Sequence, residues 1–90
     1  MSYKGADVQA LRDLANAMVA SKHDVEAALA RTRNELAHLN WHGPDRDRFV
    51  SEWGHHEGFL RQICQGLEHA AQDAVAHAAA QERVSGGGGW

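Results

Sequence analysis

The chain has 90 residues, of which 43% are hydrophobic and 23% are charged, and its formal net charge is −3. This length allows one small domain, and the charge lacks the basic excess that nucleic-acid binders use to neutralise phosphates. A single cysteine excludes an internal disulfide framework, and no apolar run approaches the roughly 20 residues that cross a bilayer. We expect one domain with no nucleic-acid partner and no stable membrane insertion.

The start of the chain does not have the pattern of a cleavable signal peptide. Arg12, Asp13 and Asn16 interrupt the apolar residues where such a peptide needs a continuous apolar block. We therefore expect the protein to be cytoplasmic when it is made.

The first predicted element is an amphipathic helix over about residues 7–40. No glycine or proline lies between Ala6 and Asn40, and Asp7 is a suitable N-cap. Residues at alternating three- and four-residue steps form a heptad seam, to which only Lys22 and Thr32 are poorly suited. This seam consists of Val8, Leu11, Ala15, Met18, Lys22, Val25, Leu29, Thr32, Leu36 and Leu39.

A turn is predicted at residues 41–44, where the chain reads Trp41-His42-Gly43-Pro44. A Gly-Pro pair between two heptad stretches is typical of the turn of an antiparallel helical hairpin. Pro44 suits the first position of a helix, where its missing N–H costs nothing. The large ring of Trp41 must be covered, and it can pack on the last turn of the first helix.

A second helix is predicted over about residues 45–83, followed by a flexible glycine-rich tail at 85–90. We therefore place one hairpin domain at 1–84. The side chains of the second seam are bulky near the turn and shrink to alanine towards the end. This seam consists of Phe49, Trp53, His56, Leu60, Ile63, Leu67, Ala70, Ala74, His77 and Gln81.

Two helices cannot bury all of these apolar residues. Small domains without disulfides commonly gain stability by oligomerisation, so we predict an obligate dimer in which two hairpins form an all-α four-helix bundle. The residues expected at the hairpin and dimer interfaces are Leu11, Met18, Val25, Leu29, Leu36, Phe49, Trp53, Leu60, Ile63 and Leu67.

These residues carry a resemblance to a known family. With Trp41-His42-Gly43 at mid-chain, followed by Phe49 and Trp53, the chain resembles the WXG family, the Esx-type proteins of type VII secretion systems. The resemblance covers about residues 6–83. It implies a hairpin that forms a homodimer, or a heterodimer with a sister WXG protein. It also implies export in the folded state through a membrane ATPase, without a cleavable signal peptide.

The chain departs from the family at one motif. Members that carry their own export signal have Tyr-x-x-x-Asp/Glu just past the second helix, whereas residues 75–83 contain no tyrosine. Either a partner supplies the signal and the contact with the ATPase, or the protein is not exported. The alternative function is therefore a chaperone-like or structural hairpin that stays in the cytoplasm and binds another helical protein.

The seven histidines are unusual for a chain of this length. His38 and His42 stand four apart, and His55 and His56 follow Glu52, but these spacings match no established zinc signature. We expect solvated histidines, no metal and no cofactor. If His56 and His77 were buried in the seam, their protonation would weaken the bundle between pH 7 and 5.

We find no sequence feature that predicts an enzyme. There is no phosphate-cradling glycine loop followed by a helix, and a two-helix hairpin offers no concave pocket of useful volume. Cys64 neighbours the seam and is expected to act as a small apolar residue. We predict a non-catalytic protein that works by association.

Overall fold

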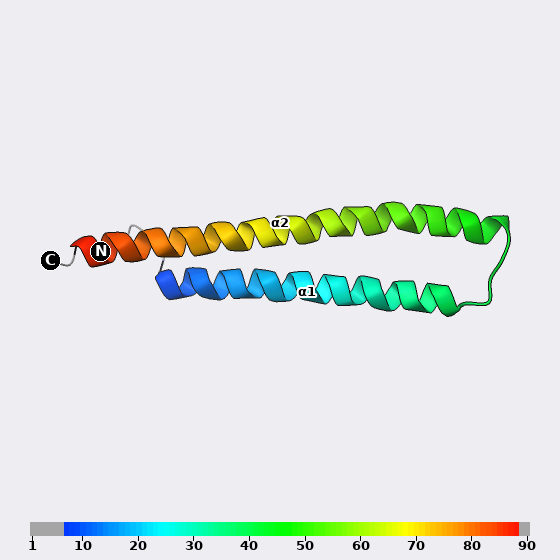
Figure 1. Ribbon diagram of the computed structural model, residues 1–90, viewed down its shortest axis with the longest axis horizontal. Coiled ribbons are helices and arrows are strands. Elements are labelled where there is room, and N and C mark those ends of the chain that lie inside the picture. The colour runs from blue at the N-terminus through cyan, green and yellow to red at the C-terminus, as the bar shows by residue number, and fades with distance from the viewer. Residues whose placement is uncertain (1–6, 89–90) are drawn as a thin grey trace.

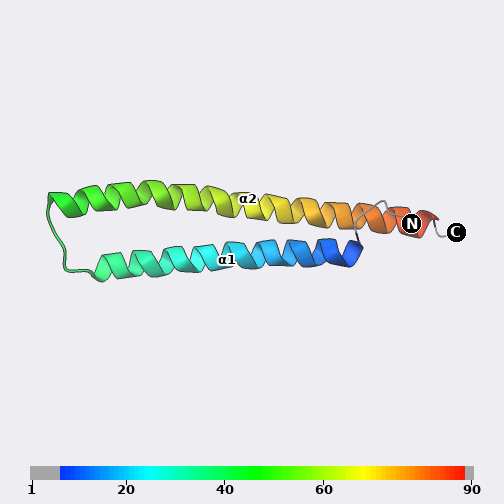
Figure 2. The same ribbon diagram turned by 180° about the vertical axis from the view of Figure 1, so that it is seen from behind.

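The protein folds as an antiparallel hairpin of two long helices. The computed structural model describes residues 7–88 and the side chains of 7–84, and this part of the chain contains no strand. Helix α1 spans Val8–His38 and α2 spans Pro44–Gly88. The helices run side by side from the connection at one end (Figure 1), and the view from behind agrees (Figure 2). The prediction of an all-α helical hairpin is confirmed.

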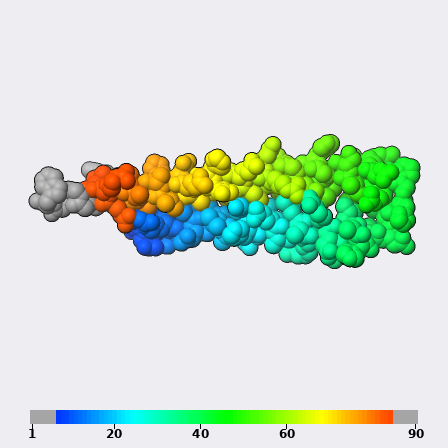
Figure 3. Space-filling model, in the orientation of Figure 1, coloured from blue at the N-terminus to red at the C-terminus, as the bar shows by residue number. Residues whose placement is uncertain are grey.

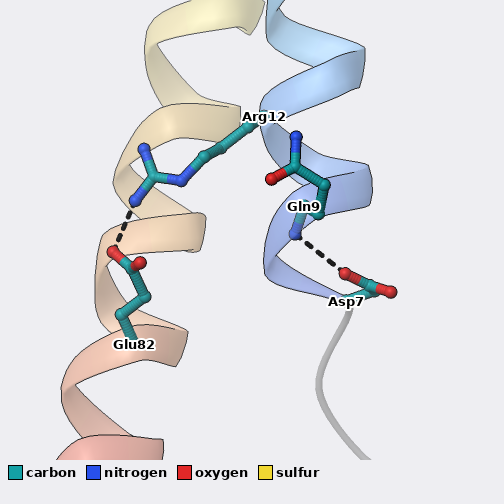
Figure 4. Close-up of polar contacts among 4 residues, drawn as sticks. All are labelled: Asp7, Gln9, Arg12 and Glu82. Atoms are coloured by element: carbon teal, nitrogen blue, oxygen red, sulfur yellow. Dashed lines mark hydrogen bonds and ion pairs between the residues drawn. The ribbon is translucent and has the colours of Figure 1, made fainter.

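Helix α1 begins with a side-chain cap. The Oδ1 of Asp7 accepts hydrogen bonds from the backbone N–H groups of Gln9, at 2.8 Å, and Ala10, at 3.3 Å; Figure 4 shows the shorter of the two. These bonds satisfy two of the first-turn donors that have no partner within a helix. At the other end α1 stops at His38, two residues before the predicted boundary.

The connection consists of residues 39–43, and Gly43 has its most unusual backbone conformation. Its φ of +107° lies in the region that side chains with a Cβ rarely adopt. The carbonyl of Gly43 accepts from the N–H of Asp47 at 3.1 Å, which closes the first turn of α2. Pro44 is the first helical residue, as expected, and Asp45 and Asp47 occupy the positive end of the helix dipole.

Helix α2 is longer than its partner, with 45 residues against 31. Its end therefore projects past the start of α1 (Figure 1). The helix continues to Gly88, five residues beyond the predicted boundary, because extending an existing helix adds one hydrogen bond per residue without a new nucleation cost. Gly89 and Trp90 of the predicted tail lie outside the described residues.

The seam between the helices follows the predicted heptads of α1 closely. Of the predicted α1 positions within the described chain, only Thr32 and Leu39 are exposed, while the others are buried or half-buried. On α2, the series that faces α1 consists of Val50, Trp53, Glu57, Leu60, Cys64, Leu67, Ala71, Ala74, Ala78 and Gln81.

The observed series differs from the predicted α2 seam at half of the predicted positions. Trp53, Leu60 and Leu67 lie in the seam, but Phe49 and Ile63 lie one residue away and are exposed, as are His56 and His77. Two overlapping heptad series compete on α2, and the structure uses the one with the smaller side chains. Small residues such as Ala71 and Ala78 let the helix backbones approach, which bulkier residues at these positions would prevent.

The buried core of the hairpin is small. Among the described side chains, the buried apolar ones are Ala15, Leu29, Cys64, Ala71, Ala74 and Ala78. Ala15, Ala71 and Ala74 form one cluster, against which Met18 packs. The molecule is a rod of 71 × 17 × 17 Å (Figure 3). A rod of two helices leaves most large apolar side chains without full cover.

Candidate protein-interaction surface

The seam divides the hairpin surface into two flanks of opposite chemistry. In an antiparallel helix pair, the heptad positions beside the seam on one helix meet the same positions of the other helix. One side, which we name the charged flank, carries eight charged residues, Arg12, Lys22, Glu26, Arg33, Glu57, Arg61, Glu68 and Glu82, and also the exposed Val19 and Val75. The other side, the apolar flank, consists of Leu14, Ala28, Phe49, Phe59, Ile63 and Ala70.

The charged flank carries the ion pairs that join the two helices. Arg12 pairs with Glu82 near the open end (Figure 4), Lys22 Nζ lies 3.2 Å from Glu68 Oε1, and Arg33 Nη2 lies 3.3 Å from Glu57 Oε1. Because these pairs lie at the surface, each contributes little to stability. All three pairs lie on the same side of the seam.

Lys22 and Glu57 explain how the seam tolerates charged residues. Both stand at seam positions, yet each extends its charged head to the charged flank and finds a partner there. The hydrogen bond to Glu68 raises the pKa of Lys22 above its usual value, and the negative charges of Glu68 and Glu26 add to this effect. The carboxylate of Glu57 is 12% exposed and is neutralised by Arg33. Six of the eight charged residues of this flank thus form ion pairs across the seam.

A polar depression of about 460 Å³ lies on the charged flank. Its walls include Lys22, Arg33, Arg61, Cys64 and Glu68. Cys64 is buried, and its Sγ lies 3.8 Å from the carbonyl oxygen of Lys22, so the thiol packs within the hairpin as a small side chain. We find no geometry there that points to a ligand.

The apolar flank differs from the charged flank, because it exposes large apolar side chains to water. Phe59 is 62% exposed, Phe49 and Leu14 are 47% exposed, and Ile63 is 41% exposed. Phe59 and Ile63 are four residues apart on α2 and are therefore neighbours on the helix surface. Ser21, Glu35, His56 and His77 are the polar residues at heptad positions on this side. Large apolar side chains exposed on one side of a helix pair are typical of a protein-interaction site.

The apolar flank ends in a groove at the turn. This turn-end groove has a volume of about 430 Å³, and its walls are Arg31, Thr32, Glu35, Leu36, Leu39, Trp41, Phe49 and Trp53. Phe49 belongs to both the groove and the flank, so the groove adjoins the apolar flank. The sequence contains the signal for this surface, since Phe49 and Ile63 lie in the unused heptad series of α2.

Trp41 forms one wall of the groove. Its ring centroid lies 5.4 Å from that of Phe49, with the ring planes at 55°, a tilted arrangement that aromatic pairs favour. The N–H of Trp41 donates to the carbonyl of Leu39 at 3.0 Å, which orders the connection. Trp41 therefore packs against α2 through Phe49, and it borders the last turn of α1 together with Leu36 and Leu39.

Three of the histidines make contacts with different neighbours. His38 Nδ1 is 2.7 Å from the carbonyl oxygen of Asn34, and His42 Nε2 is 3.1 Å from Asn40 Oδ1. The ring of His56 lies 6.1 Å from that of Trp53. Within residues 7–88 no group of three or more His, Cys, Asp or Glu residues is arranged to hold a metal ion.

Two further findings bear on the assignment. Over the described residues, neither helix combines the length and the apolar character needed to span a bilayer. No protein-family model, no curated protein and no solved structure matches this chain.

Proposed function

We propose that this chain works by protein association, as a WXG-type substrate or co-secreted partner of a type VII secretion system. In this proposal two hairpins pack into a four-helix bundle, either as a homodimer or with a sister WXG protein. The bundle is made in the cytoplasm and leaves in the folded state without a cleavable signal peptide. It carries no catalytic site and needs no cofactor.

The apolar flank is the observation that carries this proposal. Exposing Phe49, Phe59 and Ile63 to water is unfavourable by roughly 25 cal/mol for each Å² of apolar surface, which a second hairpin would recover. On the charged flank, by contrast, three ion pairs already join α1 and α2. A hairpin with ion pairs on one flank and exposed apolar side chains on the other is suited to a four-helix bundle.

The resemblance supplies the link to secretion. Trp41-His42-Gly43 occupies the connection between the helices, and the hairpin architecture is the one that the WXG resemblance implies. Residues 75–83 carry no Tyr-x-x-x-Asp/Glu motif. In this proposal the contact with the secretion ATPase is therefore made through a partner chain.

Secretion can be tested in a host that carries a type VII system. We expect the chain to reach the medium only when the ATPase is intact and a sister chain that carries the tyrosine motif is co-expressed. A double variant with Phe59→Ser and Ile63→Ser should be retained in cells, whereas Val19→Ser with Val75→Ser, on the other side of the seam, should be exported. Export that is unchanged by deletion of the ATPase would contradict a type VII route.

The missing motif favours a second candidate, a cytoplasmic hairpin that binds another helical protein and is not exported. This candidate uses the same apolar flank, so the two differ only in destination. Retention of the chain in cells with an intact ATPase and a co-expressed sister chain would support it.

A further inference from the structure

We propose that the apolar flank accepts a helix of a different protein whose apolar stripe is bordered by lysine and arginine side chains. Where the two compete, this basic helix displaces a second copy of the chain. The inference rests on the proposed association function and deepens it, because it gives the chemistry by which a partner is selected. A partner of different sequence is also able to carry the Tyr-x-x-x-Asp/Glu motif that residues 75–83 lack.

Acidic side chains border the apolar flank on both helices. We name them the acidic rim, which consists of Asp24, Glu35, Glu52 and Asp73, all of them exposed. Glu52 and Asp73 stand at the same heptad position of α2 as Phe59. On α1, Glu35 stands at the heptad position of Ala28, and Asp24 lies one turn before Ala28 on the same face. The carboxylates therefore lie beside the exposed apolar side chains.

The acidic rim accounts for the net charge of the whole chain. The four basic and four acidic residues of the charged flank cancel. Beside the four rim carboxylates stands one cation, Arg31, at the heptad position of Asp24, which leaves a charge of −3 on this side. Asp45 shares the heptad position of Glu52, but it pairs with Arg48. The remaining charges of the chain cancel, so its formal charge of −3 belongs to the side of the apolar flank.

The rim carboxylates also lack ion-pair partners within the hairpin. Among the side chains of residues 7–84, the five ion pairs all use other acidic residues. Beside the apolar flank, Phe59 is 62% exposed and Ile63 is 41% exposed. A bound helix can therefore bury apolar surface and pair its cations with the rim in the same contact.

A second copy of the chain meets only part of these requirements. It covers Phe59 and Ile63, but it brings a second acidic rim and Arg31 as the cation beside it. A helix with lysine or arginine beside its apolar stripe covers the same side chains and pairs with the rim. Charge complementarity at the edge of an interface selects among partners that bury similar apolar surface. Salt screens exposed charges, so this selection weakens as the ionic strength rises.

Two synthetic peptides of roughly four heptads test the preference. Both have leucine along the apolar stripe, and the positions that border the stripe are lysine in one peptide and glutamate in the other. Each peptide carries a fluorescent label, and anisotropy measures its binding to the full chain at low and at high salt. Native mass spectrometry determines how many copies of the chain each complex contains.

We expect the lysine peptide to bind at least about tenfold more tightly than the glutamate peptide at low salt. Most of this preference should disappear at about 1 M salt, where the screening length falls to about 3 Å. The complex should contain one copy of the chain, because the peptide displaces the second. Phe59→Ser with Ile63→Ser should weaken the binding of both peptides, since both cover the apolar flank.

Two double variants with the same change of net charge separate the rim from the overall charge. Glu35→Gln with Glu52→Gln removes half of the acidic rim and should reduce the preference for the lysine peptide at least about threefold. Asp13→Asn with Glu26→Gln removes two carboxylates outside the rim and should keep the preference. Circular dichroism checks that each variant keeps its helices.

The contrary outcomes separate this inference from the proposed function. Equal binding of the two peptides, or an equal effect of the two charge variants, would overturn the basic partner and leave association through the apolar flank intact. Failure of both peptides to bind, or a complex that keeps two copies of the chain, would also overturn it. The proposed function is tested without the peptides, by native mass measurement of the chain alone and with a sister chain. The absence of any complex in that measurement would contradict the function itself.

Discussion

The rings of Trp41 and Phe49 lie 5.4 Å apart at 55° and join the connection to the first turns of α2. This contact couples a residue of the turn to a residue of the apolar flank. Replacing Trp41 with alanine removes the aromatic pair and opens the turn-end groove. We expect Trp41→Ala to lower the free energy of unfolding by about 1–3 kcal/mol, whereas Trp41→Phe should retain most of it.

Urea unfolding followed by far-ultraviolet circular dichroism measures both Trp41 variants. The comparison with Trp41→Phe separates loss of an aromatic ring from loss of the indole itself. If Trp41→Ala were as stable as the parent chain, the contact with Phe49 would have no role in holding the connection.

Gly43 is the residue whose backbone the connection requires. At φ +107° a Cβ is strained even though nothing lies within 4 Å of where it would stand. Gly43→Ala should therefore destabilise the hairpin by about 1 kcal/mol. Gly54 is the matched control, because it also has open space around it but lies within α2, so Gly54→Ala should stabilise by about 1 kcal/mol. Equal shifts in the two variants would refute this account of the turn.

Ala71 lies in the buried cluster with Ala15 and Ala74, where the helices come close. A leucine there has no space, so Ala71→Leu should cost about 1–3 kcal/mol of unfolding free energy. Ala76 is exposed on the same helix, and Ala76→Leu should change stability by less than about 0.5 kcal/mol. Thermal unfolding of the two variants provides the test, and a tolerated leucine at position 71 would mean that the small series does not form the seam.

We expect His56 and His77 to make the proposed association depend on pH. Both are exposed in the hairpin and lie on the side of the apolar flank, with Glu35 of α1 on the same side and Glu52 one turn before His56. A second hairpin would cover these rings, and covering a charged ring costs more than covering a neutral one. Because a lower pH favours the charged form of histidine, the dimer should weaken between pH 7 and 5.

Sedimentation equilibrium at pH 7 and pH 5 measures this effect. His56→Gln with His77→Gln should remove most of the pH dependence, whereas His23→Gln with His55→Gln, which changes the same number of exposed histidines outside the flank, should keep it. A dimer of equal affinity at the two pH values would contradict a covered flank.

The sequence predicts α1 well because only one heptad series is available there. Between Asp7 and His38 no second apolar series competes, and the Asp7 cap marks the start. The connection is equally well marked, because Gly43 supplies a positive φ and Pro44 a helix start. Local chemistry alone is sufficient to define these features.

The facing residues of α2 could not be predicted in the same way. One series contains Phe49 and Ile63, and the other, one residue later, contains Val50, Cys64 and Ala71. The larger side chains bury more area and so look like the better seam. The choice between them depends on how closely two backbones can approach, which is a property of the pair of helices rather than of either sequence.

The end of α2 is a second feature that could not be predicted from the sequence. Residues 85–88 contain one serine and three glycines, a composition that predicts a loop, yet the backbone is helical through Gly88. Composition describes the cost of starting a helix in this segment. It does not describe the smaller cost of extending one that already exists.

In the proposed function, the apolar flank is the surface on which this protein associates. Sedimentation equilibrium of the parent chain and two double variants tests it directly. We expect a dimer for the parent and for Val19→Ser with Val75→Ser. For Phe59→Ser with Ile63→Ser we expect a helical monomer, with dimer affinity at least about tenfold weaker. A parent chain that is a stable, cooperatively folded monomer at micromolar concentration, or a dimer that only the Val19 and Val75 variant disrupts, would contradict it.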